Sequence, residues 1–134
     1  LGEDGCDTAA PSVDDVALGS KNVRPIAVAM AAGRTAVVTR GTVDTRLVVV
    51  DEAGDVVFEG PTQGSALAAR GGDFYAMRSG GLSRFSAMAP DSATPVEGLN
   101  ASDIVVDLVL TDGAIFVVTL DSNDIARLVC VPEG

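Results

Sequence analysis

The sequence predicts an all-β protein. Short runs rich in valine, in which apolar and polar residues alternate, are separated by Gly, Asp, Asn and Ser, a pattern typical of strands joined by tight turns. No long segment combines a 3.6-residue apolar period with capping residues at both ends, so no long helix is expected. With 134 residues, 47% of them hydrophobic, the chain can form one compact core. We expect an N-terminal segment, residues 1–12, and one domain, residues 13–134.

The individual strands can be placed by their apolar runs. In the first part of the domain, strands are expected at Ile26–Met30, Thr35–Thr39, Arg46–Val50 and Val56–Phe58. Later strands are expected at Phe74–Met77 and Ile115–Thr119, and a further one closes on Val96–Gly98. Most of these runs fall within four to six residues, a length that is common for strands in compact domains.

A repeat organises these strands. Each unit has an apolar strand that ends on a turn glycine, and these glycines are 39 and 41 residues apart: Gly33, Gly72 and Gly113. An arginine followed by a large apolar residue opens a third strand in each unit, at spacings of 38 and 43 residues: Arg46, Arg84 and Arg127. Because independent landmarks give one period, we expect three units at residues 23–60, 64–98 and 103–134.

A period near 40 residues with four antiparallel strands per unit resembles the blade of a β-propeller, as in WD40, NHL and quinoprotein-type repeats. The Trp-Asp pair of WD40 repeats is absent, so the resemblance implies an architecture and no particular activity. It implies a β-propeller-like fold of three blade-like repeats, the last of which stops after its third strand. The preceding segment, Val13–Gly19, resembles a fourth strand and could complete the last blade. The alternative is a β-sandwich or barrel in which the period is accidental.

The resemblance also implies association, because three blades cannot close a propeller alone. Two copies about a twofold axis would make a six-bladed ring, in which each N-terminal strand completes a blade of its own or of the neighbouring subunit. Otherwise, a protein partner or further blades would cover the terminal faces. We therefore expect a protein partner or a homodimer.

Charge and composition exclude several functions. The chain has 9 basic and 19 acidic residues, and a net charge of −10 opposes binding to nucleic acid phosphates. No apolar run approaches the ~18 residues of a membrane-spanning helix. The absence of histidine removes the commonest general base and nucleophile systems. Carboxylate pairs among Asp14, Asp15, Asp103 and Asp107 are nominal acid–base candidates, but no feature sets two of them at a working distance.

The second unit contains the best binding candidates. Tyr75, the only tyrosine, lies among arginines and resembles an interaction hot spot. The candidate binding residues are Arg70, Tyr75, Arg78 and Arg84. In the alternative interpretation, Tyr75 packs between blades and the arginines neutralise neighbouring acids. The arginines that recur in each unit are expected to be structural.

Acidic turns are weak candidates for metal ligands, at Asp51, Asp55, Asp121 and Asp124. Tight hairpins use the same residue types, so no metal and no cofactor are expected. Cys6 and Cys130 could form a disulfide that closes almost the whole chain, or they could be two free thiols. The acidic, thiol-poor composition and the single lysine, Lys21, favour an extracellular or cell-envelope protein of bacterial origin.

We therefore expect a non-enzymatic binding or assembly module of a secreted or cell-envelope protein, which presents a propeller-like surface to a partner or to itself. Two alternatives stay open. The chain could be a fragment or accessory subunit of a larger β-propeller enzyme, or it could be a carbohydrate-binding propeller. The low aromatic content, 4% with no tryptophan, counts against sugar binding because sugar rings stack on aromatic faces.

Overall fold

The structure, a computed structural model, describes residues 22–79, 81–100 and 102–133. This part of the chain contains strands β1 to β11 and no helix, so the all-β prediction is confirmed. It accordingly has no helix long and apolar enough to span a membrane. The expected N-terminal segment 1–12 and the expected strand Val13–Gly19 lie outside the described residues.

The strands form three antiparallel sheets, in each of which neighbouring strands follow the chain order. Sheet 1 contains β1 (Arg24–Ala31), β2 (Arg34–Arg40), β3 (Thr45–Val50) and β4 (Val56–Thr62). Sheet 2 contains β5 (Leu67–Arg70), β6 (Asp73–Arg78), β7 (Gly81–Ser86) and β8 (Ala93–Pro95). Sheet 3 contains β9 (Ile104–Thr111), β10 (Ala114–Leu120) and β11 (Ala126–Pro132). The strand that was expected to close on Val96–Gly98 lies just before this segment, in β8.

The turn glycines join the first and second strands of each sheet. Gly33, Gly72 and Gly113 have φ angles of +75°, +86° and +84°, a region that favours glycine because it has no Cβ. In the first two hairpins the preceding residue, Ala32 or Gly71, also has a positive φ, which is typical of a type I′ turn. Tight turns of this type match the twist of the strands they connect, so these glycines fix where each hairpin folds back.

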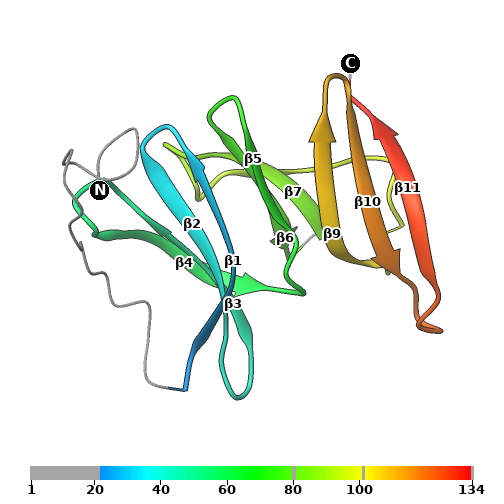
Figure 1. The fold of residues 1–134 in the computed structure, drawn as a ribbon, viewed down its shortest axis with the longest axis horizontal. Coiled ribbons are helices and arrows are strands. Elements are labelled where there is room, and N and C mark those ends of the chain that lie inside the picture. Colours follow the sequence, from blue (N-terminus) through cyan, green and yellow to red (C-terminus); the bar gives the residue numbers. More distant parts are fainter. Residues whose placement is uncertain (1–21, 80, 101, 134) are drawn as a thin grey trace, which may run out of the picture.

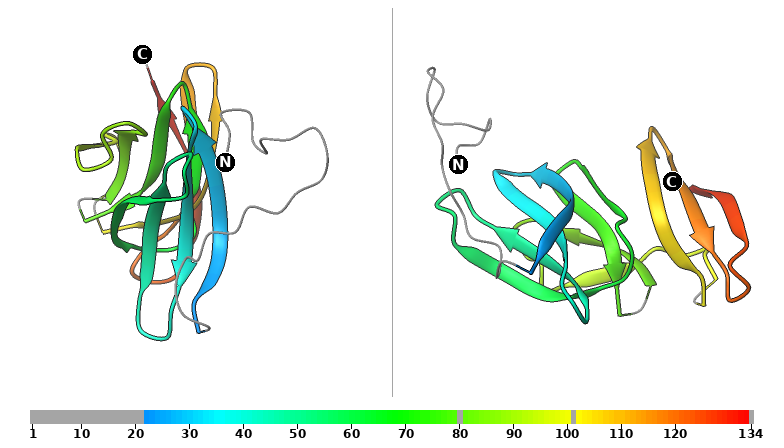
Figure 2. Two further views of the ribbon diagram at one scale, coloured as in Figure 1. Left: turned by 90° about the vertical axis from the view of Figure 1, so that its left-hand side faces the viewer. Right: turned by 60° about the horizontal axis from the view of Figure 1, so that its bottom comes forward.

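The three sheets stack face to face, with sheet 2 between the other two (Figures 1 and 2). The first strands lie alongside one another, because β5 contacts both β1 and β9. We call the face of each sheet on the side of the next sheet along the chain its front, and the opposite face its back. The front of sheet 1 thus packs on the back of sheet 2, and the front of sheet 2 on the back of sheet 3.

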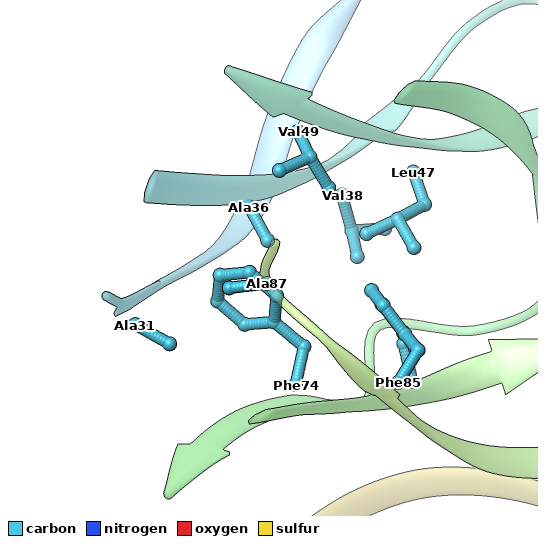
Figure 3. Close-up of a cluster of buried hydrophobic side chains, with 9 residues drawn as sticks. Ala31, Ala36, Val38, Leu47, Val49, Phe74, Phe85 and Ala87 are labelled. Atoms are coloured by element: carbon cyan, nitrogen blue, oxygen red, sulfur yellow. The ribbon is translucent and has the colours of Figure 1, made fainter. Parts of the chain in front are cut away.

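A cluster of buried side chains fills the space between sheets 1 and 2 (Figure 3). Val38, Leu47 and Val49 come from the front of sheet 1, and Phe74 and Phe85 come from the back of sheet 2. The two phenyl rings lie 5.8 Å apart between centroids and are tilted by 46°, an arrangement that aromatic pairs favour. Aliphatic side chains therefore meet an aromatic pair across this interface.

A second cluster fills the space between sheets 2 and 3. Tyr75, Met77 and Leu82 come from the front of sheet 2, and Ile115 and Val117 come from the back of sheet 3. Consecutive residues of β6 thus point to opposite clusters, as the two-residue period of a strand requires. Because both faces of sheet 2 are covered, the run Phe74–Met77 is buried at every position.

The turn glycines give a common numbering for the three sheets. Residues three and five positions after each glycine lie on the front of the second strand, namely Ala36 and Val38, Tyr75 and Met77, and Phe116 and Val118. Residues three and five positions before each glycine lie on the back of the first strand, namely Met30 and Val28, Ala69 and Leu67, and Leu110 and Leu108. Equivalent positions can therefore be compared from sheet to sheet.

Replacing Phe85 with alanine should destabilise the fold strongly. The substitution removes a buried ring from the first cluster and leaves a cavity, so we expect a loss of about 3–5 kcal/mol in the free energy of unfolding. The free energy of unfolding is measured by urea denaturation. Met88→Ala, at an exposed position shortly after Phe85, is the control and should change stability by less than about 0.5 kcal/mol. Equal effects of the two substitutions would contradict the assignment of the core.

Candidate functional site

The structure divides the four candidate binding residues between two faces of sheet 2. Arg70, Tyr75 and Arg84 lie on its front, against sheet 3. Arg78 lies on its back, against sheet 1, since it follows Met77 in β6. The four residues therefore do not form one surface patch.

Tyr75 lies at the centre of a polar cluster between sheets 2 and 3. Its hydroxyl accepts a hydrogen bond from Arg70 Nη2 at 3.2 Å and donates one to Glu133 Oε2 at 3.1 Å. Arg70 and Glu133 also form an ion pair with each other, and Arg70 Nη1 donates to the Thr111 carbonyl oxygen. Two of the three side chains come from sheet 2, and Glu133 directly follows β11. The cluster therefore links the end of sheet 3 to sheet 2 through hydrogen bonds and an ion pair.

Tyr75 cannot itself contact a partner, since only 2% of its surface is exposed. The alternative interpretation, in which Tyr75 packs between units and arginines neutralise acids, describes the observed contacts of Arg70 and Tyr75. Glu133 was not identified from the sequence. It lies 58 residues from Tyr75 in the sequence, and a local sequence pattern does not predict a contact between residues that far apart.

Arg84 occupies a different register position from Arg46 and Arg127, the arginines expected to be its equivalents in the other two units. It pairs across strands with Tyr75, three residues after the turn glycine, and lies 3.9 Å from Glu133 and 3.8 Å from Asp73. By contrast, Arg46 and Arg127 pair with threonines six residues after their turn glycines, on the back of their sheets. The expected equivalence of Arg84 with Arg46 and Arg127 is therefore wrong, because the three residues do not occupy one register position.

Arg46 and Arg127 bind acids of their own sheets. Arg46 Nε lies 2.9 Å from Glu59 Oε1 and its Nη1 lies 3.3 Å from Asp44 Oδ2, and the hydrogen bond to Glu59 is the main cause that raises the pKa of Arg46. Arg127 Nη2 lies 3.5 Å from Asp121 Oδ2. These contacts fit a structural role for both arginines.

Arg78 lies between two aromatic rings at the other interface. Its guanidinium carbon is 4.3 Å from the centroid of Phe58 in sheet 1 and 4.9 Å from that of Phe85, and Nη1 donates to the Pro90 carbonyl oxygen. Burial lowers the pKa of Arg78, while the charge of Asp91 opposes this shift. Arg78 also lines a cavity of about 480 Å³ with Thr62, Gln63, Ser79 and other neighbours. The cation–π contacts hold its guanidinium at the junction of sheets 1 and 2.

A smaller cavity of about 180 Å³ lies between sheets 2 and 3, lined by Glu97, Asn100, Asp103, Thr119 and others. The buried hydroxyl of Thr119 has no hydrogen-bond partner among the described residues. A water molecule in the cavity is the simplest partner for such a group. Among the other nominal acid–base candidates, Asp107 lies exposed on sheet 3, and Asp14 and Asp15 lie outside the described residues.

The acidic turns use their carboxylates to hold the backbone. Asp51 Oδ1 accepts hydrogen bonds from the backbone N–H groups of Ala53 and Asp55, at 3.0 and 2.9 Å. Asp121 Oδ1 likewise accepts from Asn123 and Ile125, at 2.8 and 3.0 Å. In the described part of the chain, no three Asp, Glu, Cys or His side chains gather as metal ligands would. The carboxylates of Asp51 and Asp121 therefore serve as acceptors within their hairpins, and Asp55 and Asp124 complete the same two turns.

The front of sheet 3 carries exposed apolar side chains. Phe116 is 38% exposed, and its cross-strand neighbour Val109 is 61% exposed. Leu128 of β11, on the same face, is 74% exposed. Ile104 at the end of this face is exposed as well. These residues, which we call the front patch, come from all three strands, so the apolar surface is continuous across the sheet.

The front patch was only partly anticipated by the sequence, which marks these strands as apolar without showing which face stays uncovered. Cys130 lies beside Phe116 on this face, and its side chain is exposed. Cys6 lies outside the described residues, so the disulfide between the two cysteines stays a prediction.

Comparison of the chain with protein-family models, with curated proteins and with solved structures finds no match. The candidate function therefore depends on the geometry of the described residues alone.

Replacing Tyr75 with phenylalanine should weaken the junction of sheets 2 and 3. The substitution removes one hydroxyl that both accepts from Arg70 and donates to Glu133, and we expect a loss of about 1–2 kcal/mol in the free energy of unfolding. A double-mutant cycle with Glu133→Gln should give a coupling energy of at least about 0.5 kcal/mol. Strict additivity of the two substitutions would show that the hydroxyl and the carboxylate do not interact.

Asp121 should make the fold sensitive to acid. Backbone hydrogen bonds from Ile125 and Asn123 lower the pKa of Asp121 below its usual value. Its stabilising contribution is therefore present above the unfolded pKa of about 3.9 and is lost as the pH falls through the lower pKa of the folded state. Asp121→Asn keeps the accepting oxygen but cannot titrate. Denaturation midpoints measured from pH 7 to pH 2 should fall less steeply below pH 4 for the variant, and superimposable profiles would refute this role.

Proposed function

We propose that the chain is a non-enzymatic binding and assembly module, and that it binds a further β-sheet on the front patch of sheet 3. The observation that carries this proposal is that the front of sheet 3, unlike the fronts of sheets 1 and 2, is not covered by another sheet among the described residues. The front of sheet 1 is covered by sheet 2, and the front of sheet 2 is covered by sheet 3. The front of sheet 3 is the same kind of face, but it is exposed.

The comparison holds at equivalent positions. Three residues after the turn glycine, Ala36 and Tyr75 are buried, whereas Phe116 is exposed. On the third strand, Leu47 pairs with Val38 and is buried by sheet 2, whereas Leu128, which pairs with Val118 at the equivalent position of sheet 3, is 74% exposed. An apolar patch that crosses all three strands of a sheet marks an interaction site, because single exposed apolar residues are scattered on ordinary surfaces.

The outer edge of sheet 3 is also open among the described residues. In sheets 1 and 2 the third strand pairs with a fourth, β3 with β4 and β7 with β8. In sheet 3 the third strand, β11, pairs only with β10 in the described part of the chain. An unpaired edge presents free backbone donors and acceptors that favour the addition of a strand.

The finer architecture that we propose is propeller-like, with the expected strand Val13–Gly19 supplying a fourth strand to sheet 3. Sheets 1 and 3 are at opposite ends of the stack (Figure 1), separated by two intersheet spacings of about 10 Å each. The residues from Gly19 to Arg24 span at most about 18 Å when extended. This length favours completion of sheet 3 in a neighbouring molecule over completion within one chain. As a secreted or cell-envelope protein, such a module would act through its surfaces alone.

Leu128→Asp tests the proposed function. The substitution introduces a charge into the front patch at an exposed position, so it should leave the unfolding midpoint unchanged while reducing binding of an apolar fluorescent dye severalfold. It should also abolish association of the chain at raised protein concentration, measured by sedimentation, because an unpaired carboxylate is costly to bury.

The matched control is Val43→Asp, which adds the same charge at an exposed position in the turn between β2 and β3. It should bind dye and associate as the wild-type chain does. If Leu128→Asp and Val43→Asp behave alike in both measurements, the front patch is not a binding surface.

A further inference from the structure

The back of sheet 1 is exposed along β1, at positions that the other sheets bury. Val28 is 67% exposed and Met30 is 43% exposed, five and three residues before the turn glycine. At the equivalent positions, Leu67 and Ala69 of β5 pack against the cluster shared with sheet 1. Leu108 of β9 is likewise buried against sheet 2.

The exposed apolar residues on the back of sheet 1 lie at its two edges, along β1 and at Val56 of β4, which pairs with Val50 and is 51% exposed. On the same back face, Val37 and Val48 of the neighbouring strands are buried in the structure. Val28 pairs across strands with Val37, so the exposed residues of β1 border this buried part directly. The exposed residues of β1 therefore lie where a neighbouring first strand would pack, as β5 packs on β1 and β9 on β5.

We propose that the front patch of sheet 3 binds the β1 strip, Val28 and Met30 on the back of sheet 1, in a second copy of this chain, with β9 against the β1 strand of that copy. This inference rests on the proposed function, and it names the sheet that the front patch binds. Within one chain, the same contact occurs twice, from sheet 1 to sheet 2 and from sheet 2 to sheet 3. The proposed contact continues this stacking between molecules, with front again meeting back.

The pairing of a front with a back also determines the assembly. Each copy contributes one front patch and one β1 strip, so two copies can satisfy both contacts at once if the stack curves into a ring. The dimer would then contain six sheets, within the usual range of about four to eight blades for propellers. A closed ring leaves no terminal face exposed.

Asp107 argues against a dimer in which two front patches meet. It is exposed on the front of sheet 3, where it pairs with Val118, as Ala27 pairs with Val38 in sheet 1. A twofold contact between front patches would bring two Asp107 carboxylates to one apolar interface, where like charges repel. A front-to-back contact places only one Asp107 in each interface.

The test compares Val28→Asp with Val109→Asp, two substitutions of the same kind at positions of similar exposure on the two faces. Each should raise the dissociation constant of the dimer by at least about 100-fold, measured by sedimentation velocity. Both variants should keep the wild-type unfolding midpoint because both side chains are exposed. Val43→Asp is again the control and should dimerise as the wild-type chain does.

Mixing the two variants gives a sharper result. The Val28→Asp chain keeps an intact front patch and the Val109→Asp chain keeps an intact β1 strip, so the mixture should form heterodimers through one intact contact. Neither variant alone should dimerise at the same concentration. Heterodimers that fail to form would overturn the front-to-back arrangement.

The outcomes separate this inference from the proposed function. If Val109→Asp prevents association and Val28→Asp does not, the front patch binds a sheet other than the back of sheet 1, and only the inference fails. If neither substitution has an effect, the proposed function fails as well.

Asp107→Ala provides an independent check, because it introduces the residue type that sheet 1 has at the equivalent position, Ala27. Removing an uncompensated carboxylate from the interface should lower the dissociation constant of the dimer by at least about tenfold. Weaker association of this variant would mean that a basic group faces Asp107. The back of sheet 1 carries such a group at Arg46 of β3 and not on β1, so this result would overturn the placement of β9 against β1.

Discussion

The burial of sheet 2 on both faces is the constraint on which the rest of the structure depends. Its central strand, β6, is apolar at every position from Phe74 to Met77, and its side chains enter the two clusters alternately. A sheet of this kind needs a second sheet on each side, because either face would otherwise expose a large apolar surface. Sheets 1 and 3 supply these covers, and each consequently has one face directed away from the stack.

Polar contacts at the margins of the stack fix how the sheets face one another. Arg34 of sheet 1 donates to the Ala87 carbonyl oxygen beyond β7, and Arg70 of sheet 2 donates to the Thr111 carbonyl oxygen of β9. The hydroxyl of Tyr75 and the carboxylate of Glu133 add further bonds at the second interface. Apolar packing supplies most of the attraction between sheets, whereas these directional bonds define one relative position.

The strands and hairpins could be predicted from the sequence because they depend on local pattern. Valine-rich alternation located β1 to β3, and the turn glycines marked the first hairpin of each sheet. The face of Arg84 could not be predicted, because it depends on the length of the hairpin before it. Arg78 pairs with Gly81 across a short turn, whereas Arg40 pairs with Thr45 across a longer one. This difference moves the arginine of sheet 2 to the other face.

The candidate site could be predicted less well than the strands. Tyr75 and Arg70 were identified by residue type, but their partner Glu133 is distant in the sequence, and burial removes Tyr75 from the surface. The front patch depends on which of two apolar faces remains uncovered. That property belongs to the order of the sheets in space, and no single strand encodes it.

The molar mass of the wild-type chain in solution tests most directly the central claim, that the stack continues between molecules. Light scattering across a range of protein and salt concentrations should show a rise toward about 27 kDa, twice the 13.5 kDa of one chain. Higher salt should strengthen the association, because it screens the repulsion between chains of net charge −10. A mass of 13.5 kDa at every concentration, with or without salt, would show that the three sheets are complete by themselves and would contradict this account.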